Sequence, residues 1–359
     1  MKILFVAPGM RFGGAERVMS ILANRWVQHG IEVRILLSGT AAESYYSLDD
    51  KIELISIYGD LKNKKCKPLA AIREIKKLCK EWQPDVALCF YNDLCALTAI
   101  ALSGLNIPVL YSERNDPTRT NQRKIDKIYR KIVESRCDGV VFQTEGAKSY
   151  YPVSVQKKSR VIVNPVDISK IPFWDERKED KFIISVGRLT SQKRQDILIE
   201  AFSKIADKYP EYQLRIYGTG ELKESLQKQI EEAQLSARVE LCGTEPNVLA
   251  VVAKSSLFVL SSDYEGIPNV LVEAMAIGVP CVSTDCSPGG ARMFLQNGVN
   301  GYLVPCADVD SLASAMAQML EDRRAACSFG RAALEIRNQI DVEKVSQKWL
   351  DFISTCIKK

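Results

Sequence analysis

The sequence predicts an α/β protein with two domains of similar size, each built around a parallel sheet. Its 359 residues exceed the usual length of one domain. Short apolar runs alternate with helical patterns along the chain, which is typical of parallel strands joined by helices. Residues 164–180, NPVDISKIPFWDERKED, are rich in Pro and charge and lack periodicity, so we expect a hinge between the domains there.

The first domain is expected over residues 1–165 and begins with a βαβ unit. Residues 2–7, KILFVA, form an apolar run after the lysine, as expected for a strand that is covered on both faces. Apolar residues near helical spacing predict a helix over residues 15–29, which Gly30 ends. Further strands are predicted at IEVRILL, DVALCF, PVLYSE and GVVFQT.

The second domain is expected over residues 166–340. Its predicted strands are KFIISVG, QLRIYG, RVELCG, LFVLSS and PCVSTD, and helices are predicted over residues 195–208 and 222–233. Residues 341–359 predict a closing helix. We expect the two domains to face each other across a central cleft.

Composition excludes several classes of site. The eleven cysteines include no C-x-x-C pair and several lie in apolar runs, so we expect free thiols in the cytoplasm and no disulfide framework. His29 is the single histidine, which argues against histidine-based metal sites and Ser-His-Asp triads. The sequence contains no run of 18 apolar residues, so we expect no membrane span, and the first residues lack the pattern of a signal peptide.

Basic residues gather in the first domain. Residues 1–165 carry 26 Lys and Arg against 17 Asp and Glu, a net charge of +9, whereas the remaining residues carry −4. Two interpretations stay open, namely solvated helix faces or a surface that meets anionic lipid or a diphosphate-linked acceptor. The overall charge of +5 is too small to indicate nucleic acid. The clusters are KNKKCK at 62–67, then Arg73, Lys76, Lys77 and Lys80, and residues 119–131.

The string SSDYEGIPNVLVEAMAIGVPCVSTD, residues 261–285, carries the strongest chemical signal. Glu265 lies on the loop after a predicted strand, and Glu273 lies in the first turns of the helix that follows. Ligands of open α/β sheets bind at the carboxyl ends of strands, and helix N-termini attract phosphate. Glu273 could therefore accept both hydroxyls of a ribose.

Two further segments offer groups that suit phosphate just after predicted strands. In SVGRLTSQKRQ, Arg188 and Lys193 supply a guanidinium fork and a point charge, which fit the two phosphates of a nucleoside diphosphate. In GGAER, Gly13 and Gly14 precede a helix and let backbone N–H groups approach a phosphate closely.

The spacing of Glu265 and Glu273, the string GIPNVLVEAMA followed by GVP, and the turn GRLTSQK together resemble glycosyltransferase family 4, which comprises retaining enzymes of the GT-B fold. The resemblance covers both domains and is strongest over residues 185–305. It implies that the closing helix returns to the first domain and that a nucleotide-sugar donor binds the second. The donor-binding residues that it implies are Gly13, Gly14, Arg188, Lys193, Gly218, Gly243, Thr244, Glu265, Gly266, Ile267, Pro268, Asn269, Val270 and Glu273.

The resemblance also implies catalytic roles. Arg188 and Lys193 would stabilise the charge that develops on the leaving diphosphate, while Glu265 would orient the donor sugar and steady its oxocarbenium-like centre. Gly218 would lie beside the nucleotide, and the backbone at Gly243 and Thr244 would read the uracil edge. No second base is evident, so front-face attack assisted by the departing phosphate oxygen is the implied mechanism.

The acceptor side is expected in YSERNDPTRTNQRK, residues 111–124. Glu113 and Arg114 follow a predicted strand and are expected to point into the cleft, across from Glu265. Many family members have a histidine near this point where this chain has Arg114 or Asn115, so the role of that histidine is not carried over.

Residues Asp308–Asp310 form a D-x-D sequence, a motif that is typical of metal-dependent glycosyltransferases of another fold. Here it directly precedes SLASAMAQML, so we interpret Asp310 as the N-cap of a helix. A diphosphate held by Arg188, Lys193 and a helix terminus needs no divalent ion. We therefore expect no metal and no cofactor.

The expected function is transfer of a hexose or N-acetylhexosamine from a UDP-sugar to a lipid-linked or polysaccharide acceptor in bacterial surface glycan biosynthesis. An undecaprenyl-diphosphate-linked glycan is one such acceptor. The expected location is the cytoplasm, with the inner face of the cell membrane as one possible site of action. A nucleotide-sugar epimerase or hydrolase of the same architecture stays open, as does a non-catalytic module, which would be expected to lose Glu265 or Lys193. A dinucleotide oxidoreductase is disfavoured because no complete G-x-G-x-x-G follows the first strand.

Overall fold

A computed structural model describes residues 1–11, 13–39, 44–57, 68–120, 123–175, 177 and 180–357. The chain divides into two compact units, Met1–Asp167 with Ile340–Lys359, and Ile168–Gln339. The chain passes between the units twice, first after Asp167, within the predicted hinge, and again after Gln339. The basic stretch at 62–67 and residues 121–122 of the acceptor-side segment lie outside the described residues.

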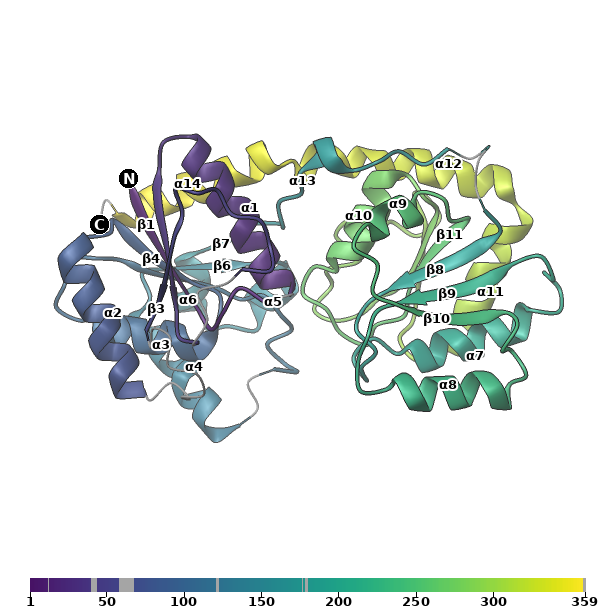
Figure 1. Cartoon of the computed structure of the whole chain (residues 1–359), viewed down its shortest axis with the longest axis horizontal. Coiled ribbons are helices and arrows are strands. Elements are labelled where there is room, and N and C mark those ends of the chain that lie inside the picture. The colour runs from purple at the N-terminus through teal and green to yellow at the C-terminus, as the bar shows by residue number, and fades with distance from the viewer. Residues whose placement is uncertain are drawn as a thin grey trace. The chain divides into compact units, whose positions relative to one another are not determined.

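The described residues of the first unit form a parallel sheet of seven strands in the order β3-β2-β1-β4-β5-β6-β7 (Figure 1). Strand β1 pairs in register with β2 on one side and with β4 on the other, so Phe5 lies opposite both Ile35 and Leu88. The strands are β1 Lys2–Ala7, β2 Glu32–Leu37, β3 Glu53–Ser56, β4 Val86–Cys89, β5 Val109–Ser112, β6 Gly139–Phe142 and β7 Ser159–Val161.

Two apolar layers cover this sheet, because alternate residues of its strands point to opposite faces. Ile3 and Phe5 of β1 join a core with α1 and α14, and α14 lies beside α1 in Figure 1. Leu4 and Val6 join the other core, with α2, α3 and α4. The helices are α1 Gly14–Gln28, α2 Pro68–Trp82, α3 Asn92–Ala101, α4 Lys124–Arg136, α5 Glu145–Ser149, α6 Val153–Lys157 and α14 Val342–Ile357.

The second unit repeats this design with a parallel sheet of six strands in the order β10-β9-β8-β11-β12-β13. These are β8 Phe182–Val186, β9 Gln213–Tyr217, β10 Val239–Gly243, β11 Leu257–Leu260, β12 Cys281–Thr284 and β13 Tyr302–Val304. Strand β8 is central and pairs with β9 and β11. The helices are α7 Gln195–Ile205, α8 Lys223–Glu232, α9 Val248–Val252, α10 Asn269–Ile277, α11 Val309–Glu321, α12 Arg323–Ala333 and α13 Arg337–Ile340, with 3-10 turns η1 Ile168–Lys170 and η2 Leu334–Ile336.

The α/β class, the two parallel sheets and the return of the closing helix to the first unit are confirmed. The prediction for Asp310 is wrong, because Asp308 is the N-cap of α11 and accepts a hydrogen bond from the Ser311 backbone N–H at 2.9 Å. Asp310 lies two residues further on, in the first turn of α11, and pairs with Lys204 at 2.5 Å. Among the described residues, no helix combines the length and apolar content needed to cross a membrane.

Candidate functional site

The strand order of the second unit reverses between β8 and β11. Strands β8, β9 and β10 follow one another in one direction across the sheet, and β11, β12 and β13 follow in the other. The loops after β8 and β11, residues 187–194 and 261–268, therefore leave the same edge of the sheet from adjacent strands. Open parallel sheets bind ligands at this switch point.

An ion pair between Lys193 and Glu265 joins these two loops. The Lys193 Nζ donates to Glu265 Oε1, and the two side chains are only 13% and 10% exposed. Ser262 Oγ also donates to Glu265 Oε1, at 2.8 Å, so the carboxylate has two donors. Breaking a buried pair by removing one partner typically costs about 3–5 kcal/mol, because the other charge is left without compensation.

The backbones of the same loops are fastened to each other. Asp263 N–H donates to the Gln192 carbonyl at 2.9 Å, and the Gln192 side-chain amide donates to the Tyr264 carbonyl at 2.9 Å. Ser261 Oγ donates to the Lys193 carbonyl at 2.8 Å. The two charged groups are therefore held by several bonds that do not involve them.

Arg194 also connects the two loops, although no sequence pattern indicated this role. It has φ of 49°, in the left-handed region that residues with a Cβ seldom adopt. Its guanidinium bonds Asp196 on α7 and reaches Asp263 on the β11 loop at 3.3 Å. The hydrogen bond that Arg194 donates to Asp196 is the main reason that the pKa of Arg194 is raised. No local pattern marks this residue, because its partner Asp263 is distant in sequence.

Glycines allow the loops to pack backbone against backbone. A Cβ on Gly218, which has φ of 141°, would lie 1.9 Å from the Gly187 carbonyl oxygen. A Cβ on Gly290 would lie 1.7 Å from the Gly266 carbonyl oxygen. The loops after β8, β9, β11 and β12 therefore meet at distances that only glycine permits.

Helix α10 starts at the site. Gly266, Ile267 and Pro268 are buried, Asn269 is the first helical residue, and Val270 is half-buried. The first turn carries no acidic residue, so no carboxylate there neutralises the positive end of the helix dipole or repels an anionic ligand. Glu273 lies in the second turn and is only 1% exposed. Gly278, with φ of 91°, ends the helix.

The remaining donor-side residues of the second unit lie on neighbouring loops. Arg188 is exposed, and its guanidinium comes within 3.5 Å of the Gln192 side-chain oxygen. Gly243 ends β10, and its carbonyl accepts from Gly218 N–H at 2.7 Å. Thr244 follows and is exposed. Their predicted roles toward diphosphate and uracil stay predictions.

In the first unit, Gly13 and Gly14 precede and begin α1. The Gly13 N–H already donates to the Tyr46 hydroxyl at 3.2 Å, and the Gly13 carbonyl accepts from the same hydroxyl at 2.9 Å. Glu16 stands in the first turn of α1 and accepts a hydrogen bond from the Tyr91 hydroxyl. A phosphate role for these amides stays a prediction, and it would require Tyr46 to give up one bond.

Glu113 and Arg114 follow β5. The Glu113 carboxylate accepts hydrogen bonds from the hydroxyls of Tyr151, at 2.7 Å, and Tyr111, at 3.1 Å. Burial raises the pKa of Glu113, and the two tyrosine hydrogen bonds oppose that rise. The Arg114 guanidinium lies over the Phe90 ring, 4.8 Å from its centre, and donates to Asn164 Oδ1 at 2.6 Å. Their predicted place on the acceptor side stays a prediction.

Among the residues that the structure describes, no group of three or more His, Cys, Asp and Glu side chains is arranged to hold a metal ion. The D-x-D carboxylates are used locally, Asp308 by the helix cap and Asp310 by Lys204.

Two family models match the chain in succession. The model described as Glycosyltransferase Family 4 matches residues 12–170, and the model described as Glycosyl transferases group 1 matches residues 168–335.

Relatives of similar length agree with these matches. A Campylobacter jejuni protein named GalNAc-alpha-(1->4)-GalNAc-alpha-(1->3)-diNAcBac-PP-undecaprenol alpha-1,4-N-acetyl-D-galactosaminyltransferase is 26% identical, over 99% of this chain and 98% of its own. A second from the same organism, N-acetylgalactosamine-N,N'-diacetylbacillosaminyl-diphospho-undecaprenol 4-alpha-N-acetylgalactosaminyltransferase, is 28% identical, over 95% and 96%. The crystal structure of Anabaena Alr3699/HepE in complex with UDP superposes with a TM-score of 0.82 at 18% identity, over 99% of this chain and 100% of that one.

The left-handed backbone at Arg194 generates a prediction about stability. Arg194→Ala loses the aspartate contacts and keeps the backbone strain, so it should lower the free energy of unfolding by about 2 kcal/mol. Arg194→Gly loses the same contacts but relieves the strain, so it should be about 0.5–1 kcal/mol more stable than the alanine variant. Urea denaturation followed by circular dichroism measures both.

The matched control is Gln234, an exposed, uncharged residue with φ of 58°. Gln234→Gly should be at least as stable as the unmodified protein, since no ionic contact is lost there. Equal stabilities for Arg194→Gly and the unmodified protein would show that the aspartate contacts contribute nothing.

Proposed function

Since the chain belongs to glycosyltransferase family 4 and is a glycosyltransferase of the GT-B fold, we propose that it moves a hexose or N-acetylhexosamine from a UDP-sugar, with retention, to a bacterial surface glycan. The observation that carries this proposal is the ion pair of Lys193 and Glu265 at the switch point of the second sheet. A cation for the leaving diphosphate and a carboxylate for the sugar are thus side by side.

Each group has a chemical task in this proposal. Lys193, Arg188 and the N-terminus of α10 stabilise the negative charge that the diphosphate gains as the sugar–phosphate bond breaks. Glu265 orients the sugar hydroxyls and stabilises the positive centre that develops on the sugar. Glu273 accepts the ribose hydroxyls, and the backbone at Gly243 and Thr244 faces the base.

The acceptor in this proposal is a lipid-linked or polysaccharide glycan, and an undecaprenyl-diphosphate-linked glycan is the preferred candidate. The support is the names of the two Campylobacter jejuni relatives, both of which specify acceptors on a prenyl diphosphate. The comparisons offer no support for a nucleotide-sugar epimerase or hydrolase.

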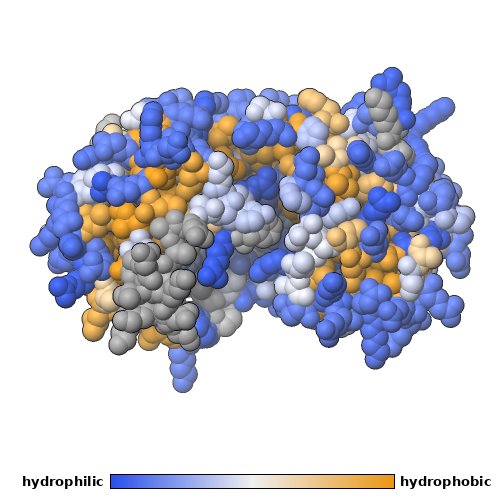
Figure 2. All heavy atoms as spheres, in the orientation of Figure 1, coloured by the Kyte–Doolittle hydropathy of each residue, from blue (hydrophilic) through white to orange (hydrophobic). Residues whose placement is uncertain are grey.

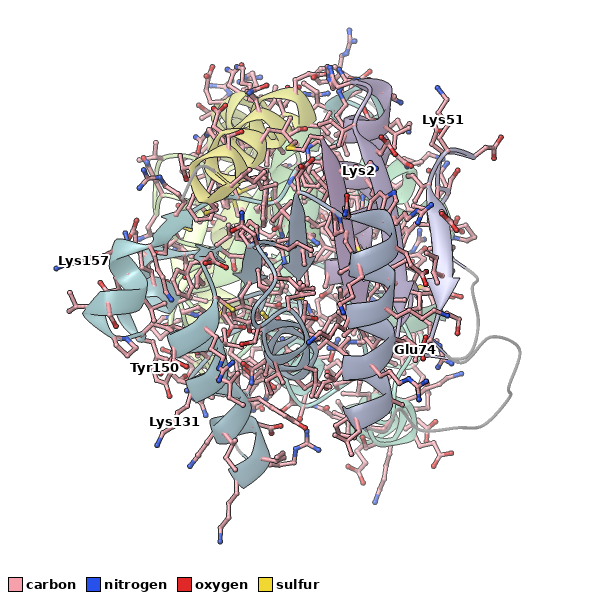
Figure 3. The ribbon with its side chains drawn as sticks, turned by 90° about the vertical axis from the view of Figure 1, so that its left-hand side faces the viewer. Lys2, Lys51, Glu74, Lys131, Tyr150 and Lys157 are labelled. Carbon is pink, nitrogen blue, oxygen red and sulfur yellow. The ribbon has the colours of Figure 1, made fainter. Side chains whose placement is uncertain are left out.

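We also propose that the first unit rests on the cytoplasmic face of an anionic membrane. Helices α2 and α4 flank α3 on one face of the first sheet. Figure 2 shows hydrophilic residues along the left-hand edge of this unit, where α2 lies, and Figure 3 shows Lys131 and Lys157 on one edge, with Tyr150 between them.

The outward face of α4 mixes cations with large apolar side chains. Ile125 and Ile128 are 43% and 54% exposed, and Lys124, Lys127 and Lys131 are exposed around them. Arg130 ties this helix to Tyr150 by a 2.8 Å hydrogen bond, and Tyr150 is itself 45% exposed. Lysines over anionic headgroups and isoleucines at the level of the acyl boundary are the combination that surface-lying helices use.

The donor-site proposal predicts different kinetic defects for two variants. Lys193→Ala should lower kcat by about 100-fold, because one charged hydrogen bond that strengthens in the transition state is worth about 1.5–3 kcal/mol. Glu273→Ala should mainly raise the KM for the UDP-sugar, about tenfold. Steady-state transfer from UDP-hexose and UDP-N-acetylhexosamine to a prenyl-diphosphate-linked acceptor measures both.

Lys204→Ala is the control for this comparison, since Lys204 lies on the neighbouring helix and pairs with Asp310 at the surface. It should leave kcat and KM unchanged. Thermal unfolding of each variant separates loss of folding from loss of chemistry. Near-normal kinetics for both Lys193→Ala and Glu273→Ala would reject the assignment of the donor site.

Metal independence is a separate proposal. Because Lys193, Arg188 and a helix N-terminus supply the positive charge, transfer should persist at its full rate in excess EDTA and should not rise when Mg²⁺ or Mn²⁺ is added. Initial rates measured in the three conditions test this. Loss of turnover in EDTA that Mn²⁺ restores would show that a divalent ion carries the leaving group instead.

The membrane proposal predicts a charge-dependent association with vesicles. Lys124→Glu, Lys127→Glu and Lys131→Glu combined should reduce flotation with vesicles containing phosphatidylglycerol by at least fivefold, since each cation near the surface contributes about 1 kcal/mol. The matched control reverses the exposed Lys223, Lys228 and Lys254 of the second unit and should float normally. Equal flotation of the two variants would show that the lysines of α4 do not contribute to membrane binding.

A further inference from the structure

Arg114 lies where four strands of the first sheet end. Phe90 follows β4, Arg114 comes two residues after β5, Gln143 follows β6, and Asn164 comes shortly after β7. The Asn164 Oδ1 accepts from Arg114 Nη2 at 2.6 Å and from Gln143 Nε2 at 2.7 Å. The guanidinium is thus built into the carboxyl edge of the sheet, the edge at which parallel sheets bind ligands.

The position of this guanidinium is fixed while most of its donors stay uncommitted. Its plane lies over Phe90, and among the residues that the structure describes its only other hydrogen-bond partner besides Asn164 is Ser112 Oγ, at the long distance of 3.4 Å. Its Nε is buried and has no hydrogen-bond partner among the described residues. A guanidinium has five N–H donors in a fork that matches the oxygens of a carboxylate or phosphate.

No carboxylate forms an ion pair with Arg114 within the described part of the chain, although the charge of the adjacent Glu113 offsets part of the cost of burial. The neighbouring Glu113 is directed elsewhere, since its oxygens accept from Tyr111, Tyr151 and the backbone N–H groups of Arg114 and Asn115. Burial lowers the pKa of Arg114 to about 10. A largely buried cation without an ion-pair partner is unfavourable for folding.

Three other half-buried arginines have either carboxylate partners or several carbonyl partners among the described residues. Arg194 pairs with Asp196 and Asp263. Arg238 and Arg337 have no carboxylate but donate to several backbone carbonyls, those of Ala206, Tyr209 and Tyr212 for Arg238, and of Ala276, Ile168 and Ile171 for Arg337. Arg114 has neither arrangement among the described residues. Arg215 also lies over a ring, that of Phe182, with a buried Nε that has no partner, but it lies within β9, whereas Arg114 lies at the carboxyl edge of its sheet, where ligands bind.

We propose that Arg114 binds a phosphate group of the acceptor, so that the enzyme selects acceptors whose reacting sugar lies near a phosphate. This inference rests on the proposed function for the identity of the acceptor, whereas the anion site itself follows from the surroundings of Arg114. Phe90 and Asn164 hold the guanidinium in one orientation, and Gln143 holds Asn164. The ordering of the receptor is therefore complete before the anion arrives.

The test is a binding measurement that needs no turnover. Isothermal titration uses the full chain saturated with UDP, which occupies the donor site, and compares geranyl-diphosphate-linked N-acetylhexosamine with the neutral octyl glycoside of the same sugar. The unmodified protein should bind the diphosphate compound at least 30-fold more tightly. Arg114→Gln should lose that preference while binding the neutral glycoside and UDP as before.

Two further variants separate recognition from folding. Arg114→Lys keeps a cation without the fork and should retain only part of the preference, about fivefold. Arg136→Gln, which removes an exposed arginine of α4, should change nothing. Thermal unfolding supplies an independent readout, because Arg114→Gln removes a largely buried charge that has no ion-pair partner among the described residues, and should unfold at the same or a higher temperature than the unmodified protein.

The outcomes divide clearly. An unchanged preference in Arg114→Gln, or a lowered unfolding temperature with unchanged binding, overturns the proposal and makes Arg114 a structural residue. Equal affinity for an octyl uronic acid glycoside overturns the assignment to phosphate. If Arg114-dependent binding is found but no UDP-sugar is transferred to any acceptor, the anion site stands and the proposed function fails.

Discussion

The buried ion pair of Lys193 and Glu265 is the interaction on which the second unit is organised. Two charges largely withdrawn from water remain stable only if each stays close to the other and to further polar partners. Ser262 supplies one such partner, and the bonds from Asp263 to Gln192 and from Ser261 to the Lys193 carbonyl hold both loops in place. The glycine contacts remove the side chains that would otherwise keep these loops apart. Nearly every feature of this edge of the sheet therefore serves to keep one cation and one carboxylate at a fixed separation.

The two units share a topology but differ in the charge of their switch points. In the second unit, a lysine lies beside the start of α10, whose first turn is free of acidic residues. In the first unit, the reversal falls between β1 and β4, where Glu16 stands in the first turn of α1 and bonds Tyr91 from the β4 loop. The Gly13 amide is bonded to Tyr46 as well. The switch point of the second unit is therefore better suited to binding phosphate. In the first unit, the cation proposed to bind an anion is Arg114, which follows β5, the strand next to β4.

Sequence patterns were sufficient to predict most of the strands and helices that form the layers of each unit, but not the side-chain contacts between residues that are distant in sequence. The runs at β1 and β8 predicted buried parallel strands because both faces of each strand are covered, whereas the three residues of β13 are too few to show a pattern. The cap of α11 was placed at Asp310 instead of Asp308 because both aspartates precede the same apolar pattern, and cap geometry alone distinguishes them. Lys193 and Glu265 were recognised by their motifs, but their direct pairing across 72 positions depends on which two strands are neighbours. Arg194 had no signal, because its role depends on a backbone angle.

How a buried charge is compensated helps to indicate what it does. Arg194 is paired with two aspartates, and such a residue can position its neighbours but has little capacity left for a ligand. Glu113 is likewise saturated, by two tyrosines and two backbone N–H groups, so its carboxylate serves the packing of the first unit before it serves any substrate. Lys193 is intermediate, since one carboxylate binds it while an ammonium group can donate three hydrogen bonds. Arg114 lies at the opposite extreme, with its plane fixed over Phe90 and no ion-pair partner among the described residues. Arg215 shows that a stacked arginine without an ion pair is not by itself a receptor, since it lies within β9. The proposed role of Arg114 therefore depends on two features together, its unused donors and its place at the carboxyl edge of the sheet.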